Sequence, residues 1–159
     1  KEKQIIFLNK IFNKKPNCFV IPKKNVFIIR YYSRGIYNLL KEHLEWNGVK
    51  TYSVRLRNID DTSKDFKIGF LRGLFDTDGS FYKPKHRISY GTVSKKLSLQ
   101  TLNLIKSLGL FPKYYILNPP NRSRFYSIVL HGEQTRKFIK LINPRNIDKL
   151  ARQSFNGRI

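Results

Sequence analysis

Asp76 and Asp78, two carboxylates separated by a single residue, are the side chains with the clearest potential for chemistry. They follow an apolar stretch that predicts a helix, and Asp78 with Gly79 forms the stop signal of that helix. The dipole of a helix makes negative charge unfavourable at its C-terminus, so we expect a cation there. Aspartate oxygens suit Mg²⁺, which typically takes one or two carboxylates together with phosphate and water. The alternative is a simple polar turn in which Gly79 adopts a left-handed conformation.

The helix that carries these acids is predicted over residues 64–76. Gly69 and Gly73 are four residues apart and share one helical face, where the backbone of another element can approach closely. Leu71 and Phe75 add apolar side chains beside the glycines. A helix that offers glycine to a partner and ends in carboxylates is unusual, and it indicates a helix that packs against another element next to a cation.

The composition points to nucleic acid as the partner. The 159 residues include 32 Lys and Arg against 10 Asp and Glu, a net charge of +22, yet 40% of them are hydrophobic and 14% aromatic. So much apolar content predicts a folded domain with a basic surface rather than a disordered chain. A single cysteine, Cys18, excludes an internal disulfide framework and is compatible with a reducing, intracellular compartment such as a prokaryotic cytoplasm or an organelle. No apolar run approaches the roughly 20 residues of a membrane span, so we expect no membrane partner.

The first 60 residues form an N-terminal extension in this interpretation. Its predicted elements are a helix over residues 2–12, a β-hairpin over 18–21 and 26–32, and a helix over 34–46 that Asn47-Gly48 closes. A polar break at residues 60–63 separates this extension, residues 1–60, from a core domain, residues 61–159. We expect the extension to add accessory DNA contacts through basic residues: Lys14, Lys15, Lys23, Lys24, Arg30 and Arg34.

The core domain is predicted to be α+β, with the order α-β-β-α-β-β-α. After the helix over 64–76, the predicted elements are strands 80–83 and 87–93, a helix from Ser94 to Gly109, strands 113–117 and 124–130, and a helix over 132–142. This order predicts a four-stranded, mostly antiparallel sheet with helices packed on it.

Alternation along the strands separates two faces of that sheet. One face is predicted to be open and to carry the residues Ser80, Tyr82, Lys85, Arg87, Ser89 and Gly91, extended by Lys113, Tyr115, Arg122 and Arg124. Phe81, Ile88, Tyr90 and Val93 then point toward the helices. Polar and basic side chains on such a surface can follow the major groove and read base edges or contact phosphates. The alternation of residues 124–130 is ambiguous, because both of its faces are apolar. The alternative for each basic residue is an ordinary solvated position.

Residues 71–79 resemble the LAGLIDADG signature of homing endonucleases, and Phe70 and Ser80-Phe81 extend the match. The departures are Arg72 for Ala, Phe75 for Ile and Thr77 for Ala. We expect Arg72 to be exposed or to reach a phosphate, and Phe75 to fill an apolar slot. The order of elements over residues 64–150 agrees as well. The resemblance implies the LAGLIDADG homing-endonuclease fold, with its curved antiparallel sheet.

The resemblance also implies an activity, the site-specific, metal-dependent cleavage of double-stranded DNA during intron homing. Cleavage would cross the minor groove of a long, pseudo-palindromic target and leave short 3′ overhangs. In the family, two motif helices pack at a pseudo-dyad and the last Asp of each coordinates the metal; Asp78 is the matching position here. The carbonyl of Thr77 is an additional candidate ligand of Mg²⁺, and Ca²⁺ or Mn²⁺ can occupy the same sites.

One motif supplies half of such a site, so the resemblance implies a homodimer. Its interface would form through the motif helices, at Gly69, Leu71, Gly73 and Asp76. A second interpretation makes the chain the C-terminal part of a protein with two motifs, because residues 18–60 resemble the strand and helix that precede a second motif.

Two further residues match positions of family helpers. Lys149, five residues after Pro144, resembles the loop lysine that approaches the scissile phosphate and stabilises its charge. Ser94 follows the second strand, where family members place a polar residue that holds active-site water. The alternatives are one more scattered cation for Lys149 and a plain helix cap for Ser94.

A different class of function remains open with the same fold. The chain could be a non-catalytic nucleic-acid binder, either an intron RNA maturase or a DNA-binding regulator. Such relatives often lose the last acid of the motif, so the presence of Asp78 favours the enzyme.

Overall fold

The computed structural model describes residues 9, 13, 15, 17–21, 26–59, 62–82 and 86–145. The helix expected over residues 2–12 therefore lies outside the described residues, except for Asn9. The chain divides into two compact units, Lys1–Glu42 and His43–Ile159. This boundary lies upstream of the one expected at residue 60, because the segment that follows residue 43 packs on the helix of residues 95–107.

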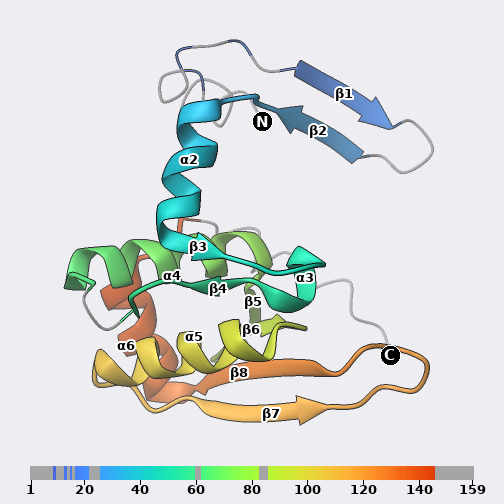
Figure 1. The fold of residues 1–159 in the computed structure, drawn as a ribbon. Helices are drawn as coiled ribbons and strands as arrows, with labels where there is room; N and C mark the ends of the chain where they lie inside the picture. Colours follow the sequence, from blue (N-terminus) through green and yellow to red (C-terminus); the bar gives the residue numbers. More distant parts are fainter. Residues whose placement is uncertain are drawn as a thin grey trace. The chain divides into compact units, whose positions relative to one another are not determined.

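The first unit contains the predicted β-hairpin and most of a helix (Figure 1). Strands β1 (Asn17–Ile21) and β2 (Val26–Arg30) pair antiparallel, as expected. Helix α2 (Arg34–His43) begins after Ser33, whose Oγ accepts a hydrogen bond from the backbone N–H of Ile36 at 3.3 Å. The prediction that this helix continues to Trp46 is wrong. Residues 44 and 45 instead form a short strand, which a helix-period pattern cannot reveal because its partner lies further along the chain.

The second unit begins with the short antiparallel pair β3 (Leu44–Glu45) and β4 (Arg55–Leu56), joined through α3 (Lys50–Ser53). The α-β-β-α-β-β-α order then follows as predicted. Its elements are α4 (Lys64–Asp78), β5 (Ser80–Tyr82), β6 (Arg87–Thr92), α5 (Lys95–Ser107), β7 (Lys113–Leu117), β8 (Phe125–His131) and α6 (Gly132–Ile142). The four strands form one antiparallel sheet in the order β5-β6-β8-β7.

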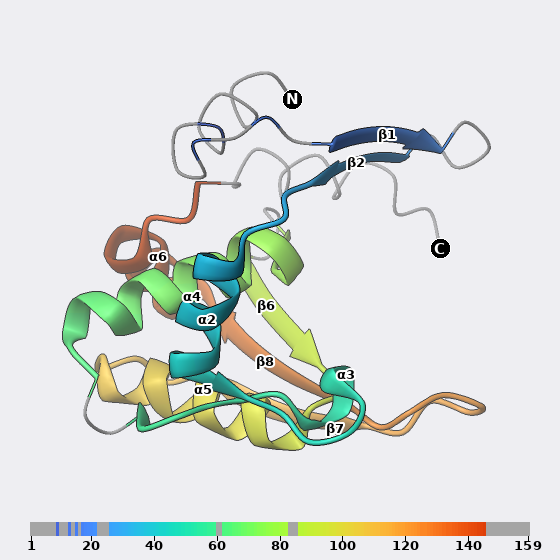
Figure 2. The ribbon, with the colours of Figure 1, turned by 45° about the horizontal axis from the view of Figure 1, so that its top comes forward.

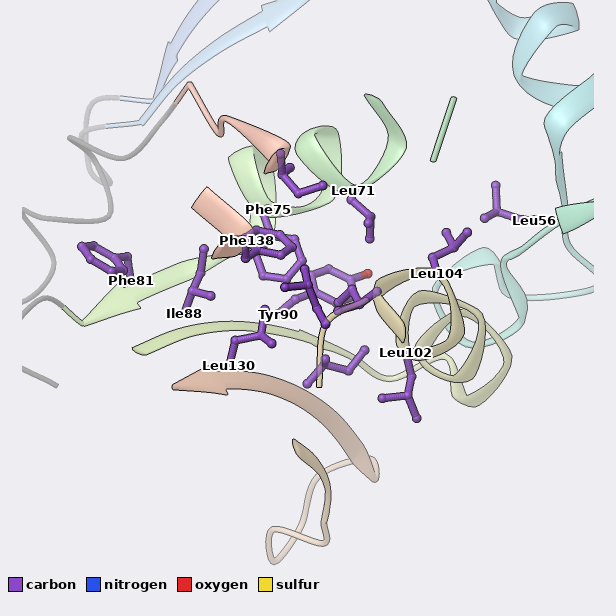
Figure 3. Close-up of a cluster of buried hydrophobic side chains, with 14 residues drawn as sticks. Leu56, Leu71, Phe75, Phe81, Ile88, Tyr90, Leu102, Leu104, Leu130 and Phe138 are labelled. Atoms are coloured by element: carbon purple, nitrogen blue, oxygen red, sulfur yellow. The ribbon is translucent and has the colours of Figure 1, made fainter. Parts of the chain in front are cut away.

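Helices α4, α5 and α6 lie on one face of this sheet (Figures 1 and 2). The core fills the space between them (Figure 3). Its members include Phe81, Ile88 and Tyr90, which the alternation assigned to the covered face. Phe75 of α4 is fully buried, with its ring centroid 4.5 Å from that of Phe138 on α6 and 5.7 Å from that of Tyr90 on β6. The signature departure at residue 75 thus fills an apolar slot, as expected.

The end of α4 differs from the simple-turn alternative. The helix continues through Asp78, and Gly79 has φ −72° and ψ 153°, an extended conformation rather than a left-handed one. A Cβ at Gly79 would lie 2.3 Å from the carbonyl oxygen of Phe75. Glycine is therefore required because the chain passes close to the last turn of α4, and this passage leads directly from Asp78 into β5.

Candidate functional site

Asp78 is an exposed carboxylate at the junction of α4 and the sheet. Its charge reaches Tyr90 on β6: burial raises the pKa of the Tyr90 hydroxyl to about 12, and the negative charge of Asp78 contributes to the rise, against a hydrogen bond with Thr92. The Thr77 hydroxyl donates back into the helix, to the carbonyl oxygens of Gly73 at 3.0 Å and Leu74 at 3.2 Å. The carbonyl of Thr77 lies in the final turn, where carbonyl groups lack a partner within the helix. One carboxylate and one carbonyl oxygen are therefore available at the same helix end.

This donor set fits half of a magnesium site. Within the part of the chain that the structure describes, no three His, Cys, Asp or Glu side chains come together in a way that could hold a metal ion. Mg²⁺ requires few protein ligands, since one or two carboxylates suffice when phosphate and water complete its shell. Asp78 can serve as one of these carboxylates.

The predicted helix–helix interface is only partly available. Gly69 and Gly73 are exposed, and an added Cβ at either would meet no heavy atom within 4 Å, so this face of α4 has room for another helix. Asp76 is half-buried. Leu71, which we expected at the interface, is instead fully buried in the core of its own unit. The correction has a simple cause, because residue 71 shares its helical face with Phe75 and not with the glycines.

Arg72 also has a different position from the one expected. Its Nε donates a hydrogen bond of 2.7 Å to the carbonyl oxygen of Ile142, the last residue of α6. A cation there complements both an otherwise unsatisfied carbonyl and the negative end of the helix dipole. Arg72 therefore ties α4 to α6 and does not project toward a phosphate.

The open face of the sheet is confirmed for the residues that the structure describes. Antiparallel partners share a face, and the register pairs Ser80 with Ser89, Tyr82 with Arg87, Arg87 with His131, Lys113 with Val129, and Tyr115 with Ser127. Arg122 and Arg124 are exposed in the loop between β7 and β8, and Arg124 Nε donates to Asn118 Oδ1 at 2.9 Å. Lys85 lies outside the described residues.

Strand β8 resolves the ambiguity of residues 124–130. Tyr126, Ile128 and Leu130 are buried on the covered face, so Ser127 and His131 lie on the open one. Sequence reasoning missed both, because a strand with apolar residues on each face gives no alternating signal. The register with the neighbouring strands β6 and β7 is what assigns each residue of β8 to a face.

Phe125 and Gly91 form an apolar contact on the open face. A Cβ at Gly91 would lie 2.1 Å from the Phe125 ring, so the absence of a side chain at residue 91 is what admits the ring. Glycine in a strand often marks such a close approach. Gly91 was expected on the open face and lies there, but the Phe125 ring covers it.

The electrostatic character of this face is positive. Partial burial lowers the pKa of His131, and the cations Lys113 and Arg87 beside it lower it further. His131 is therefore mainly neutral near pH 7, in a field that favours any anion placed over the sheet. Phosphates are the anions that a row of cations on a strand surface suits.

The two predicted helper residues have different outcomes. Ser94 is fully buried, and its hydroxyl donates to the carbonyl oxygen of Val54 at 2.8 Å and accepts from the backbone N–H of Leu97 at 3.3 Å. These bonds favour the helix cap over a residue that holds active-site water. Lys149 lies outside the described residues.

The described part of the chain contains no helix with the length and apolar character of a membrane span.

Comparison with known proteins agrees with this fold. Residues 65–143 match the family model of the LAGLIDADG-like domain, so this part of the chain belongs to the LAGLIDADG family. A solved structure, from work on mesophilic variants of the homing endonuclease I-DmoI, has a similar fold, with a TM-score of 0.58 and 18% sequence identity. The match covers 88% of this chain and 69% of that chain. No curated protein sequence matches this chain.

Proposed function

We propose that this chain is a site-specific, metal-dependent double-strand DNA endonuclease that acts in intron homing. The observation that supports the proposal most is the position of Asp78, an exposed carboxylate one residue before β5, in a sheet whose open face carries the cations Arg87 and Lys113. An acid at that place would repel DNA phosphate unless a bound cation reverses the local charge. The family to which residues 65–143 belong, and the endonuclease fold that the chain shares, agree with this interpretation.

DNA would lie along the open face of the sheet. Arg87, Lys113 and His131 would approach phosphates, while Ser89 and Tyr82 can contact base edges or sugars in the groove. In this proposal the target is long and pseudo-palindromic, and cleavage occurs across the minor groove with short 3′ overhangs. Exposed basic residues of the first unit would extend the contacts: Lys15, Arg30 and Arg34.

Asp78 and the carbonyl of Thr77 would hold the metal ion, with Mg²⁺ as the expected ion and Ca²⁺ or Mn²⁺ as substitutes. When bound, such an ion lowers the pKa of water and neutralises charge on the phosphate. The protein's own contribution is to hold the Asp78 carboxylate at a rigid helix end, which Gly79 makes possible by its close passage over Phe75. Lys149 would add positive charge near the scissile phosphate.

A second motif helix must complete the site. In the homodimer that we propose, the exposed face of Gly69 and Gly73 meets the same face of another copy, and each copy contributes its Asp78. The alternative is a first motif in the same protein. The first unit favours this alternative in one respect, because β1, β2 and α2 repeat the order of β7, β8 and α6. Solution mass distinguishes the two, since a homodimer of 18.9 kDa chains weighs about 38 kDa and a stable monomer excludes it.

Cleavage of a plasmid library of target sequences in the presence of Mg²⁺ tests the proposal. We expect double-strand cuts by the wild type and a loss of at least about 100-fold with Asp78→Asn, which keeps the shape of the side chain but removes its charge. Asp65→Asn is the matched control, because Asp65 is an exposed acid in the first turn of the same helix. Cleavage retained by Asp78→Asn would refute its metal role. DNA binding without cleavage by the wild type would favour a non-catalytic binder.

A further inference from the structure

A pocket of about 300 Å³ lies in the second unit beside the N-terminal end of α5. Its walls come from the segment between β3 and β4 and from the first turn of the helix: Glu45, Trp46, Asn47, Tyr52, Ser53, Arg55, Lys95 and Lys96. The volume is at the lower end of the range for sites that enclose a small organic molecule. Neither Asp78 nor any residue of the open sheet face contributes to this lining.

Hydrogen bonds from α5 to β4 and to the residue just before it hold this segment on the helix. The Gln100 side chain accepts from the backbone N–H of Leu56 at 2.8 Å and donates to the carbonyl oxygen of the same residue at 2.9 Å. Ser94 Oγ donates to the carbonyl of Val54 at 2.8 Å. These bonds explain why a serine is buried at residue 94, and they hold β4, which contributes Arg55 to the pocket, against α5.

Two aromatic side chains line this pocket. Tyr52 has 54% of its surface exposed, yet its hydroxyl is held by a hydrogen bond of 3.0 Å with Ser123 Oγ in the loop between β7 and β8. Trp46 is half-buried, and Lys50 Nζ lies 5.1 Å from its ring centroid. An exposed aromatic ring that is anchored at its far end loses little entropy when a flat partner stacks on it.

The charge of the lining is positive. Arg55 is paired with Glu45, and this hydrogen bond lowers the pKa of the Glu45 carboxyl. Lys95 and Lys96 are exposed on the first turn of α5, where the helix dipole adds to their positive field and which itself carries no acidic residue. Aromatic rings beside cations are the combination that binds unpaired bases, by stacking on the base and attracting its phosphate.

A duplex bound to the open face would not fill this pocket. The helices cover the opposite face of the sheet (Figures 1 and 2). The residues that line the pocket come from the segment that runs from β3 to β4 and from α5, and none comes from the four-stranded sheet. Bases inside a duplex are stacked and paired, so they cannot insert into this pocket without leaving the stack. The occupant must therefore offer a base that is already unpaired.

We propose that this pocket binds an unpaired nucleotide of a single-stranded nucleic-acid segment, with its base against Tyr52 and Trp46 and its phosphate near Lys95 and Lys96. The chain would then have two nucleic-acid surfaces, one for duplex DNA and one for a single strand. The shared chemistry is a planar base next to a phosphate, which single-stranded DNA and RNA both supply. Binding here requires no cleavage, so its test is separate from that of the endonuclease.

Trp46 reports directly on the pocket, because it is the only tryptophan in the chain. Titration of the full chain with short oligo(dT) and oligo(U) should quench its fluorescence as a base stacks nearby. We expect Tyr52→Ala to weaken this binding about 5- to 150-fold, since stacking on an aromatic side chain contributes about 1–3 kcal/mol per base. Affinity for a blunt DNA duplex should stay within about twofold of wild type.

The matched control is Tyr37→Ala, because Tyr37 is 53% exposed on α2 and is not among the residues that line the pocket. Tyr52→Phe keeps the ring and loses the bond to Ser123, so it should retain most of the affinity. Quenching by both oligonucleotides supports the shared chemistry, and quenching by oligo(U) alone supports it with an added 2′-hydroxyl contact. No quenching by either, equal loss in the two alanine variants, or reversal of the quenching by duplex DNA would overturn the proposal.

Discussion

The two faces of the four-stranded sheet are made from neighbouring residues but obey different constraints. Ile88 is fully buried under the helices, whereas the adjacent Arg87 is exposed on the open face. Substitutions on the covered face should act on stability because they create cavities, and those on the open face should act on binding because solvent already fills the space. Residues of one strand can therefore affect either the stability of the fold or the binding of DNA. Three predictions test whether these two effects are independent.

The largest effect is expected from Phe138→Ala on the covered side. Phe138 is fully buried against Phe75, so its truncation should lower the free energy of unfolding by about 3–5 kcal/mol. Chemical denaturation monitored by circular dichroism measures this. The folded fraction of the variant should bind DNA with unchanged affinity. Weaker binding by Phe138→Ala under conditions in which it is fully folded would show that the two faces are coupled.

An intermediate effect is expected from Arg87→Ala on the open face. The side chain is exposed and lies over the ring of Tyr82, its partner on β5, so the free energy of unfolding should fall by no more than about 1 kcal/mol. The slope of log affinity against log salt should fall by about one, as one phosphate contact is lost. Fluorescence anisotropy with labelled duplex measures it. Lys106→Ala is the control, since Lys106 is an exposed cation on α5, and an equal loss there would contradict a role specific to the open face.

The smallest effect is a pH dependence that depends on His131. Its pKa is lowered from 6.5, so the unfolded chain takes up the proton first. Stability from the neutral side chain is present above pH 6.5 and declines as pH falls through the lowered pKa. DNA phosphate favours the protonated form instead, so affinity should rise as pH falls below about 6.5.

Binding isotherms at a series of pH values measure this rise, and His131→Asn should reduce it. His86→Asn is the control, because His86 is exposed outside the strands. An unchanged pH profile in His131→Asn would mean that DNA does not approach this part of the face.

Local signals were sufficient wherever the partner of a residue lay within a few positions. The helix cap at Ser94, which accepts from the N–H of Leu97 at 3.3 Å, and the hairpin of β1 and β2 are examples. The open-face residues of β5 and β6 were predicted because alternation needs only the strand itself. The signature acid Asp78 was placed at a helix end by the same local reasoning.

Long-range partners explain each failure. Residues 44 and 45 leave the helix because they pair with β4, and Arg72 meets a carbonyl 70 positions away in sequence. Leu71 belongs to the core because α6 and the sheet cover that side of α4. None of these partners can be read from the spacing of neighbouring residues.

The order of the elements from residue 64 onward, the alternation along β5 and β6 and the position of Asp78 follow from the sequence, because helix and strand periods are properties of a few consecutive residues. Two features depend on the tertiary structure: which face of β8 lies beside Arg87 and Lys113, and the hydrogen bond by which Ser94 holds the segment before β4. Those outcomes depend on pairing between segments distant in the chain, and such pairing is selected by the packing of the whole unit.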